Sequence, residues 1–149
     1  LQDAGARRIF LDLKFHDIPS VVGLAVREAC RRGVWMLTMH VAGGRAMMQA
    51  AVEEASMLPE EARPCLLGVT VLTSLDDRAL RDEIGVPATV EEQMLRMSRL
   101  AIENELDGVV CSPHEIEALR RACGRDFLLV VPGIRPSGTE NADQKRVLT

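Results

Sequence analysis

Short apolar segments alternate with longer amphipathic segments along most of this chain. The apolar segments each predict a β-strand, and they span residues 9–15, 34–41, 66–73, 107–112 and 127–134. Apolar side chains recur with helical spacing between them, and the helices expected from this spacing span residues 19–32, 47–55, 89–104 and a segment from 113 onward. Residues 75–87 form a charged insertion, expected to be a loop with a short helix.

Local signals mark where several of these helices begin and end. Gly33 is expected to end the first helix. Thr89 is followed three residues later by Glu92, which predicts a capping box at the start of the third. Ser112 is expected to cap the fourth, because Pro113 suits the first position of a helix.

Five strands alternating with helices predict an α/β fold with a parallel sheet. Neither a Gly-rich dinucleotide fingerprint nor a phosphate-binding P-loop is present, and a (β/α)8 TIM barrel fits better than a doubly wound sheet. A whole barrel needs about 250 residues, so residues 1–149 are expected to be a single partial TIM-barrel domain with about five βα units. The chain starts without Met and stops without a closing strand, which indicates truncation at both ends.

Composition narrows the possible partners. The net charge is −4 and no basic face stands out, so nucleic acid is not an expected ligand. No apolar run has membrane-spanning length, and the polar start does not resemble a signal peptide, so we expect a cytoplasmic protein away from membranes. The four cysteines are scattered without a C-x-x-C pair, which predicts reduced thiols and neither a zinc nor a redox site.

Polar or turn-forming residues stand at the carboxyl ends of all five predicted strands, where βα barrels carry their active sites. These residues are Asp12, Lys14, Asp17, His40, Thr73, Ser74, Ser112, Pro132, Gly133 and Arg135. Among them, the rigid Pro-Gly turn followed by Arg135 suits an anionic ligand.

The first strand places charges inside an apolar segment. Because strand side chains alternate, Asp12 and Lys14 point to one face. The apolar residues Leu11, Leu13 and Phe15 point to the other. Asp17 follows just past the strand. Burying an unpaired ion costs several kcal/mol, so these charged groups are expected to take part in a reaction. Only two of the 18 Lys and Arg residues are lysines, and lysine can donate a proton near neutral pH.

Each candidate also has a structural interpretation. Asp17 could cap the helix that follows it, and Asp12 with Lys14 could form an ion pair that only stabilises the barrel. His40 could be a satisfied structural histidine. The Gly-Gly turn before Arg45 could suggest an anion site at a helix start, although a plain turn explains it better.

Four segments together resemble one enzyme family. They are DLKFHDIP at residues 12–19, VTVLTS at 69–74, DGVVCS at 107–112 and PGIRP at 132–136. Their sequence, order and spacing are similar to those of orotidine 5′-monophosphate (OMP) decarboxylases, and the resemblance covers essentially the whole chain. It implies a βα-barrel homodimer that converts OMP to UMP in pyrimidine biosynthesis without cofactor or metal.

The resemblance also implies roles for individual residues. Lys14 would be the proton donor to C6 of the pyrimidine, and Asp12 would lie beside the substrate carboxylate. Asp17 would cross the dimer interface to the ribose in the partner's site. The remaining substrate-binding residues would be Ile18, then Thr73 and Pro132 near the pyrimidine, and Arg135 and Gln144 on the phosphate side.

Two departures from the family pattern affect these expectations. Ser20 and Val21 stand where Asn and Thr are common, which predicts weaker substrate binding. An earlier Asp and Lys of the family would precede Leu1, and a Gly-Arg phosphate clamp would follow Thr149, so the fragment alone is expected to be inactive. The alternatives are a magnesium-dependent sugar-phosphate decarboxylase or synthase of the same superfamily, and a catalytically inactive barrel remnant.

Overall fold

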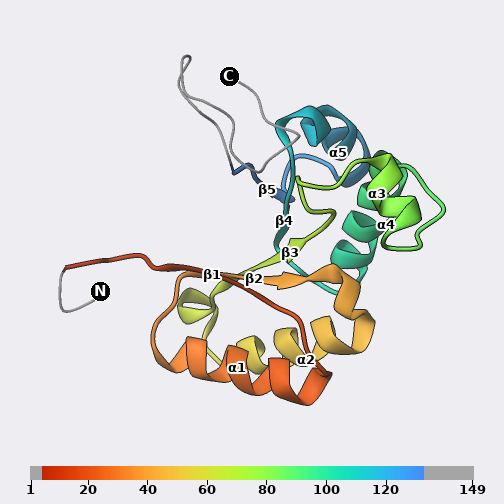
Figure 1. The fold of residues 1–149 in the computed structure, drawn as a ribbon. Helices are drawn as coiled ribbons and strands as arrows, with labels where there is room; N and C mark the ends of the chain where they lie inside the picture. Colours follow the sequence, from red (N-terminus) through yellow and green to blue (C-terminus); the bar gives the residue numbers. More distant parts are fainter. Residues whose placement is uncertain (1–4, 133–149) are drawn as a thin grey trace.

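The described part of the chain, residues 5–132 of a computed structural model, forms one sheet of five parallel strands in the order β1-β2-β3-β4-β5 (Figure 1). The strands are β1 (Phe10–Phe15), β2 (Met36–His40), β3 (Cys65–Val69), β4 (Gly108–Val110) and β5 (Leu128–Val130). The α-helices are α1 (Pro19–Arg31), α2 (Arg45–Ser56), α3 (Asp77–Asp82), α4 (Val90–Glu103) and α5 (Ile116–Cys123). Short 3₁₀ turns are η2 (Val41–Gly43), η3 (Glu60–Ala62) and η4 (Pro113–Glu115).

Sequential strands lie side by side, and a helical connection joins each pair. The β2–β3 ladder runs without a break from Met36 opposite Cys65 to His40 opposite Val69. Helices α1 and α2 lie beside β1 and β2, whereas α4 and α5 lie toward the β4 end (Figure 1). The predicted α/β class with a parallel sheet is confirmed.

The third strand is shorter than the sequence predicts. The apolar run 66–73 predicts a strand to Thr73, but β3 ends at Val69. Its neighbours explain this end, because Val69 pairs with His40 and Val110, the last residues of β2 and β4. A strand beyond both neighbours has no ladder partner, so the apolar residues that follow continue as a loop.

The helix boundaries follow the predicted local signals closely. Gly33 adopts a φ of 62° just after α1, as expected for a terminating glycine. The capping box of Thr89 and Glu92 is present in both directions at the start of α4. Ser112 caps Pro113 as predicted, but the first turn is the 3₁₀ turn η4, and α5 starts only at Ile116.

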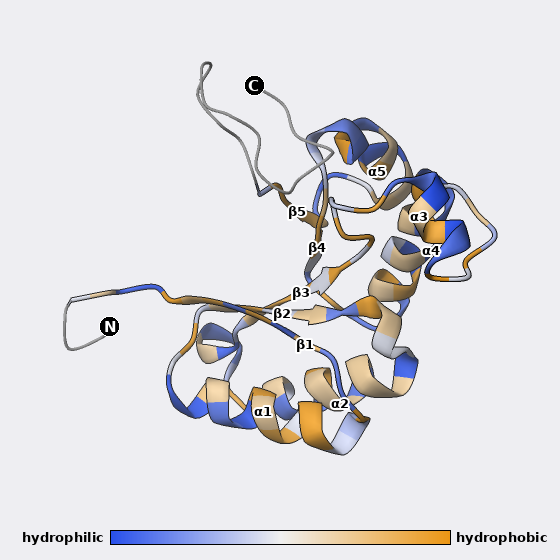
Figure 2. Ribbon diagram, viewed as in Figure 1, coloured by the Kyte–Doolittle hydropathy of each residue, from blue (hydrophilic) through white to orange (hydrophobic). Residues whose placement is uncertain are grey.

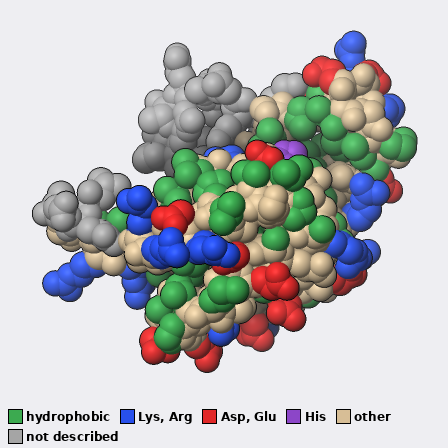
Figure 3. Space-filling view, turned by 90° about the horizontal axis from the view of Figure 1, so that it is seen from below, with side chains coloured by type: hydrophobic (Ala, Val, Ile, Leu, Met, Phe, Trp, Pro, Cys, Tyr) green, Lys and Arg blue, Asp and Glu red, His purple; other side chains and the backbone are tan. Residues whose placement is uncertain are grey.

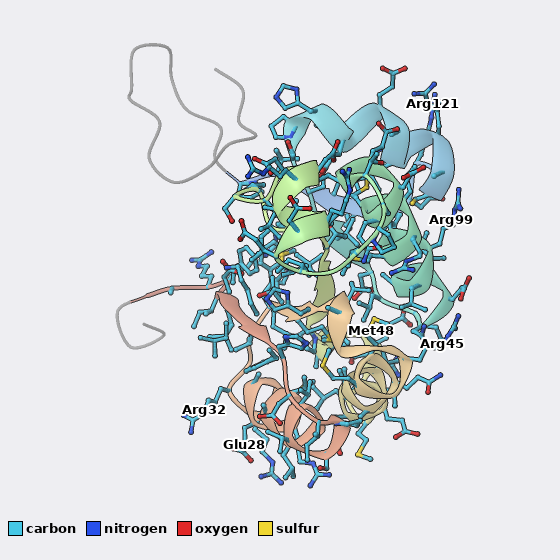
Figure 4. The ribbon with its side chains drawn as sticks, turned by 45° about the vertical axis from the view of Figure 1, so that its right-hand side comes forward. Glu28, Arg32, Arg45, Met48, Arg99 and Arg121 are labelled. Atoms are coloured by element: carbon cyan, nitrogen blue, oxygen red, sulfur yellow. The ribbon has the colours of Figure 1, made fainter. Side chains whose placement is uncertain are left out.

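The largest packed region lies between the sheet and helices α1, α2 and α4. Helices α1 and α2 pack against each other, and a methyl group at Gly23 of α1 would be in ordinary van der Waals contact with Ala50 of α2. Met48 of α2 is fully buried and points inward in Figure 4, whereas Arg45 and Arg99 project outward. In Figure 2 the helices carry both hydrophobic and hydrophilic residues, as amphipathic helices on a sheet do.

Methionines fill much of this core. Met39, Met47, Met48 and Met94 are all fully buried in the same hydrophobic cluster. Their flexible side chains suit irregular gaps between helices and sheet. These methionines therefore serve the packing of the core.

The charges on the surface and the apolar character of the helices concern two expected absences, nucleic acid and membrane as partners. Acidic and basic side chains are interspersed with hydrophobic ones on the face drawn in Figure 3. Among residues 5–132, no helix combines the length and apolar character needed to cross a bilayer.

Candidate active site

Alternate residues of strand β1 face opposite sides of the sheet, with Asp12 and Lys14 on the side away from α1. Asp12 and Lys14 line a cavity of about 190 Å³ at the carboxyl ends of the strands. Leu11, Leu13 and Phe15 line a groove beside α1 on the opposite face. The predicted alternation along this strand is therefore confirmed.

The same cavity gathers four of the candidate residues from three parts of the chain. Thr73 from the loop after β3 and Pro132 from the segment after β5 join Asp12 and Lys14 in its lining. The remaining wall is mostly apolar, including Val69 of β3. An apolar pocket with a few convergent polar groups is the usual form of a small-molecule site.

Asp12 and Lys14 form an ion pair within this cavity. Lys14 Nζ donates to Asp12 Oδ2 at 2.5 Å, and the two side chains are 40% and 47% exposed. Partial burial raises the pKa of Asp12, but hydrogen bonds from Lys14 and Thr38 and the Lys14 charge outweigh it and hold that pKa below its ordinary value. An ion pair so open to water contributes only about 0–1 kcal/mol to stability, which weakens the purely structural interpretation.

Thr38 of β2 completes the cluster, and sequence reasoning missed it. Its Oγ1 donates to Asp12 Oδ1 at 2.8 Å and accepts the backbone N–H of Lys14 at 3.0 Å. The residue is fully buried. A signal was present in the sequence, because Thr38 stands two residues before His40 and therefore shares its face of the strand.

The backbone of β1 is irregular at Lys14. The β1–β2 register shifts between Leu11 and Phe15, and Lys14 has a φ of 52°. A residue with a side chain reaches this left-handed region at a cost of about 1–2 kcal/mol. Such local strain is typical of functional sites, where it aims a side chain.

Asp17 and Ile18 lie outside the cavity, at the exposed start of α1. Asp17 accepts the backbone N–H of Ile18 at 2.7 Å, and the Ile18 side chain is 62% exposed. The N-cap of α1 is Ile18, which makes no side-chain capping bond. The alternative in which Asp17 itself caps the helix is therefore wrong.

Two histidines flank the charged cluster. The rings of His16 and His40 lie 5.1 Å apart between centroids. Burial, followed by the nearby charges of His16 and Lys14, lowers the pKa of His40. A neutral His40 adds no further positive charge beside Lys14.

The comparisons with known proteins agree with this arrangement. The model of the orotidine 5′-phosphate decarboxylase / HUMPS family matches residues 1–149. The chain belongs to this family. Its members include orotidine 5′-phosphate decarboxylases of Moorella thermoacetica, 55% identical over 95% of this chain, and Syntrophotalea carbinolica, 52% identical over all of it. The chain spans 58% and 62% of these two relatives.

Two solved structures are similar to this chain in fold. The orotidine 5′-phosphate decarboxylase of Lactobacillus acidophilus superimposes with a TM-score of 0.81 at 40% identity, over 87% of this chain and 59% of that one. An uncharacterized conserved protein of Geobacillus kaustophilus gives 0.83 at 40% identity, over 89% and 62%. The prediction of a TIM-barrel fold is confirmed.

Two further residues are expected on the phosphate side of the site. Arg135 and Gln144 lie outside the described residues, which end at Pro132. Ser112, another strand-end candidate, is a buried cap whose backbone N–H donates to Glu115 Oε2 at 2.7 Å. The described residues thus bring together Asp12, Lys14, Thr73 and Pro132, and leave Asp17 and Ile18 at an exposed edge.

Proposed function

We propose that this protein decarboxylates orotidine 5′-monophosphate to UMP in pyrimidine biosynthesis, without a cofactor. The observation that carries the proposal is the Lys14–Asp12 pair facing a cavity that Thr73 and Pro132 also line. Family membership and at least 50% identity to eight relatives named orotidine 5′-phosphate decarboxylase support the same reaction.

Lys14 has the chemistry that the reaction needs. When the bond from C6 to the carboxylate breaks, its electron pair stays on C6 and CO2 leaves. The ring offers no electron sink in the plane of that pair, so a fixed ammonium must stabilise the developing charge. Lys14 Nζ then transfers a proton to C6, which gives UMP and a neutral amine that water reprotonates.

Asp12 supports this role through charge and hydrogen bonding. Asp12 Oδ2 is in direct contact with Lys14 Nζ, so its negative charge attracts the ammonium and holds it in place. The substrate carboxylate would also lie near Asp12, where like charges repel. That repulsion favours release of CO2.

The rest of the substrate is bound by residues farther from C6. In the proposed homodimer, Asp17 reaches the ribose in the partner's site and Ile18 also binds substrate, which suits their exposed position at the start of α1. Arg135 and Gln144 hold the phosphate. Binding energy from the phosphate lowers the barrier to decarboxylation at C6. Val21 has no hydroxyl to offer the substrate, which weakens substrate binding but does not affect the chemical step. The protein works in the cytoplasm.

The test is the loss of OMP absorbance with the intact gene product in excess EDTA. We expect metal-independent turnover, and a fall of about 10²–10⁴-fold in kcat for Lys14→Ala. Lys14→Arg is the matched control, because it keeps the positive charge but cannot donate a proton near neutral pH. It should also be inactive if proton transfer is essential.

Other outcomes separate the alternatives. Turnover of a sugar phosphate that EDTA abolishes would favour the magnesium-dependent relatives. No turnover by a folded dimer would favour an inactive barrel remnant and make Val21→Thr the next variant. Residues 1–149 assayed alone are expected to be inactive, because the family's further charged residues lie outside them.

A further inference from the structure

We propose that Thr38 is the positioning residue of this site, which sets both the rotation of the Asp12 carboxylate and the backbone of Lys14. Only the kinetic test of this inference, which measures turnover of OMP, rests on the proposed function. The assigned role concerns a side chain that lies outside the DLKFHDIP segment and does not line the cavity itself.

A single hydroxyl makes both contacts. A threonine hydroxyl has one proton to donate, and Thr38 Oγ1 directs it to Asp12 Oδ1 at 2.8 Å. The same oxygen accepts the Lys14 backbone N–H at 3.0 Å. Because Thr38 is fully buried, water cannot replace either contact.

The contact with Asp12 fixes which oxygen faces Lys14. Thr38 occupies Oδ1, which leaves Oδ2 for Lys14 Nζ. Without the hydroxyl the carboxylate could rotate about its terminal torsion, which is broad and roughly two-fold. The ammonium would then lose its fixed position relative to C6.

The contact with Lys14 holds the irregular part of β1. The register between β1 and β2 is broken at this point, and the φ of Lys14 is 52°. A side-chain oxygen of β2 therefore receives the Lys14 N–H where the regular ladder is interrupted. Loss of this bond would let Lys14 relax away from the conformation that directs its side chain into the cavity.

The kinetic test compares Thr38→Val with Thr38→Ser in the intact gene product. Valine keeps the shape and removes the hydroxyl, whereas serine keeps the hydroxyl. Misplacement of a reacting group by about 1 Å can cost about 10²-fold, so we expect Thr38→Val to lower kcat by about 10- to 10²-fold with a smaller change in KM. Thr38→Ser should recover most of the loss.

A second readout does not depend on activity. Protein labelled with ¹³C at lysine Cε gives one signal for each lysine, and Lys14→Arg identifies that of Lys14. Thr38→Val should shift the Lys14 signal and leave that of Lys145 in place. The titration of Asp12, seen through Lys14, should move to higher pH, because one hydrogen bond that lowers the Asp12 pKa is gone.

The outcomes are distinguishable. An active parent protein whose Thr38→Val variant matches it in kcat and in the Lys14 signal overturns the positioning role. A parent protein without turnover overturns the proposed function, while the Lys14 signal still decides the role of Thr38. If Thr38→Val does not fold, Thr38→Ala and Thr38→Ser give the same comparison without the added methyl group.

Discussion

Two aspartates at opposite ends of the same sheet make different kinds of hydrogen bond. At the carboxyl end, Asp12 accepts from two side chains, Lys14 and Thr38. At the amino end, Asp107 accepts the backbone N–H of Leu66 at 2.7 Å, while its own N–H donates to the Leu66 carbonyl at 3.0 Å. One carboxylate orients a titratable group, and the other joins the starts of β3 and β4.

The difference matches the division of labour in βα barrels. Residues at the carboxyl ends of the strands carry chemistry, and residues at the amino ends carry stability. Asp107 replaces a missing ladder partner for a buried strand residue, since Leu66 is only 3% exposed. Both hydrogen bonds that Asp12 accepts within residues 5–132 come from side chains, and Asp12 faces a cavity. Four predictions test this contrast.

The largest effect is expected for Asp12→Asn, measured as kcat of the intact gene product on OMP. The amide keeps the shape but loses the negative charge that pairs with the Lys14 ammonium and holds it in place, so kcat should fall by about 10²-fold or more. The free energy of unfolding should change by less than about 1 kcal/mol. A variant that is strongly destabilised but fully active when folded would reverse the roles assigned to the two aspartates.

Asp107→Ala should have the opposite signature. It leaves the buried Leu66 N–H without its acceptor, which costs about 1–3 kcal/mol of unfolding free energy. The kcat of the folded protein should not change. Urea unfolding measures the first quantity, and Asp126→Ala, at an exposed aspartate before β5, is the matched control. An equal effect of the two variants would contradict the proposed role of Asp107.

Features set by neighbouring residues could be predicted from the sequence. The capping box of Thr89 and Glu92, the cap at Ser112 and the alternation of Asp12 with Lys14 each need only a few consecutive residues. Capping and strand alternation act over this short range. The structure follows these predictions, except that the turn after Ser112 is 3₁₀ and α5 begins at Ile116.

Features set by distant pairing could not be predicted in the same way. Thr38 meets Lys14 and Asp12 across 24 and 26 residues of chain, and Asp107 meets Leu66 across 41. The end of β3 at Val69 depends on where β2 and β4 stop. These contacts follow from strand register, which the apolar pattern of a single strand does not specify.

A smaller effect is expected in the pH dependence of stability at the carboxyl end. Burial, then the charges of His16 and Lys14, lowers the pKa of His40 from its ordinary value of 6.5. As the pH falls through 6.5, the unfolded chain binds this proton before the folded protein does, so the unfolding free energy decreases until the folded pKa is passed. Urea unfolding between pH 8 and 5 should show a shallower decrease for His40→Gln, but not for the exposed control His114→Gln. Parallel profiles for the parent protein and His40→Gln would contradict this role.

The smallest effect concerns two cysteines, one near each aspartate. Cys65 lies at the Asp107 end, and Cys111 lines the cavity with Asp12. Burial, with nearby Asp107 or Glu115, raises the pKa of each thiol to about 12. At pH 8 only about one thiol in 10⁴ is then ionised, and the thiolate is the form that reacts. Both thiols should therefore react slowly with iodoacetamide, and mass spectrometry of the peptides measures how far each has reacted.

Saturating UMP should slow the reaction of Cys111 further by a few-fold and leave that of Cys65 unchanged, because only Cys111 lies in the wall of the cavity proposed to hold the nucleotide. Equal protection of both cysteines would mean that the ligand stabilises the whole sheet rather than occupying its carboxyl end.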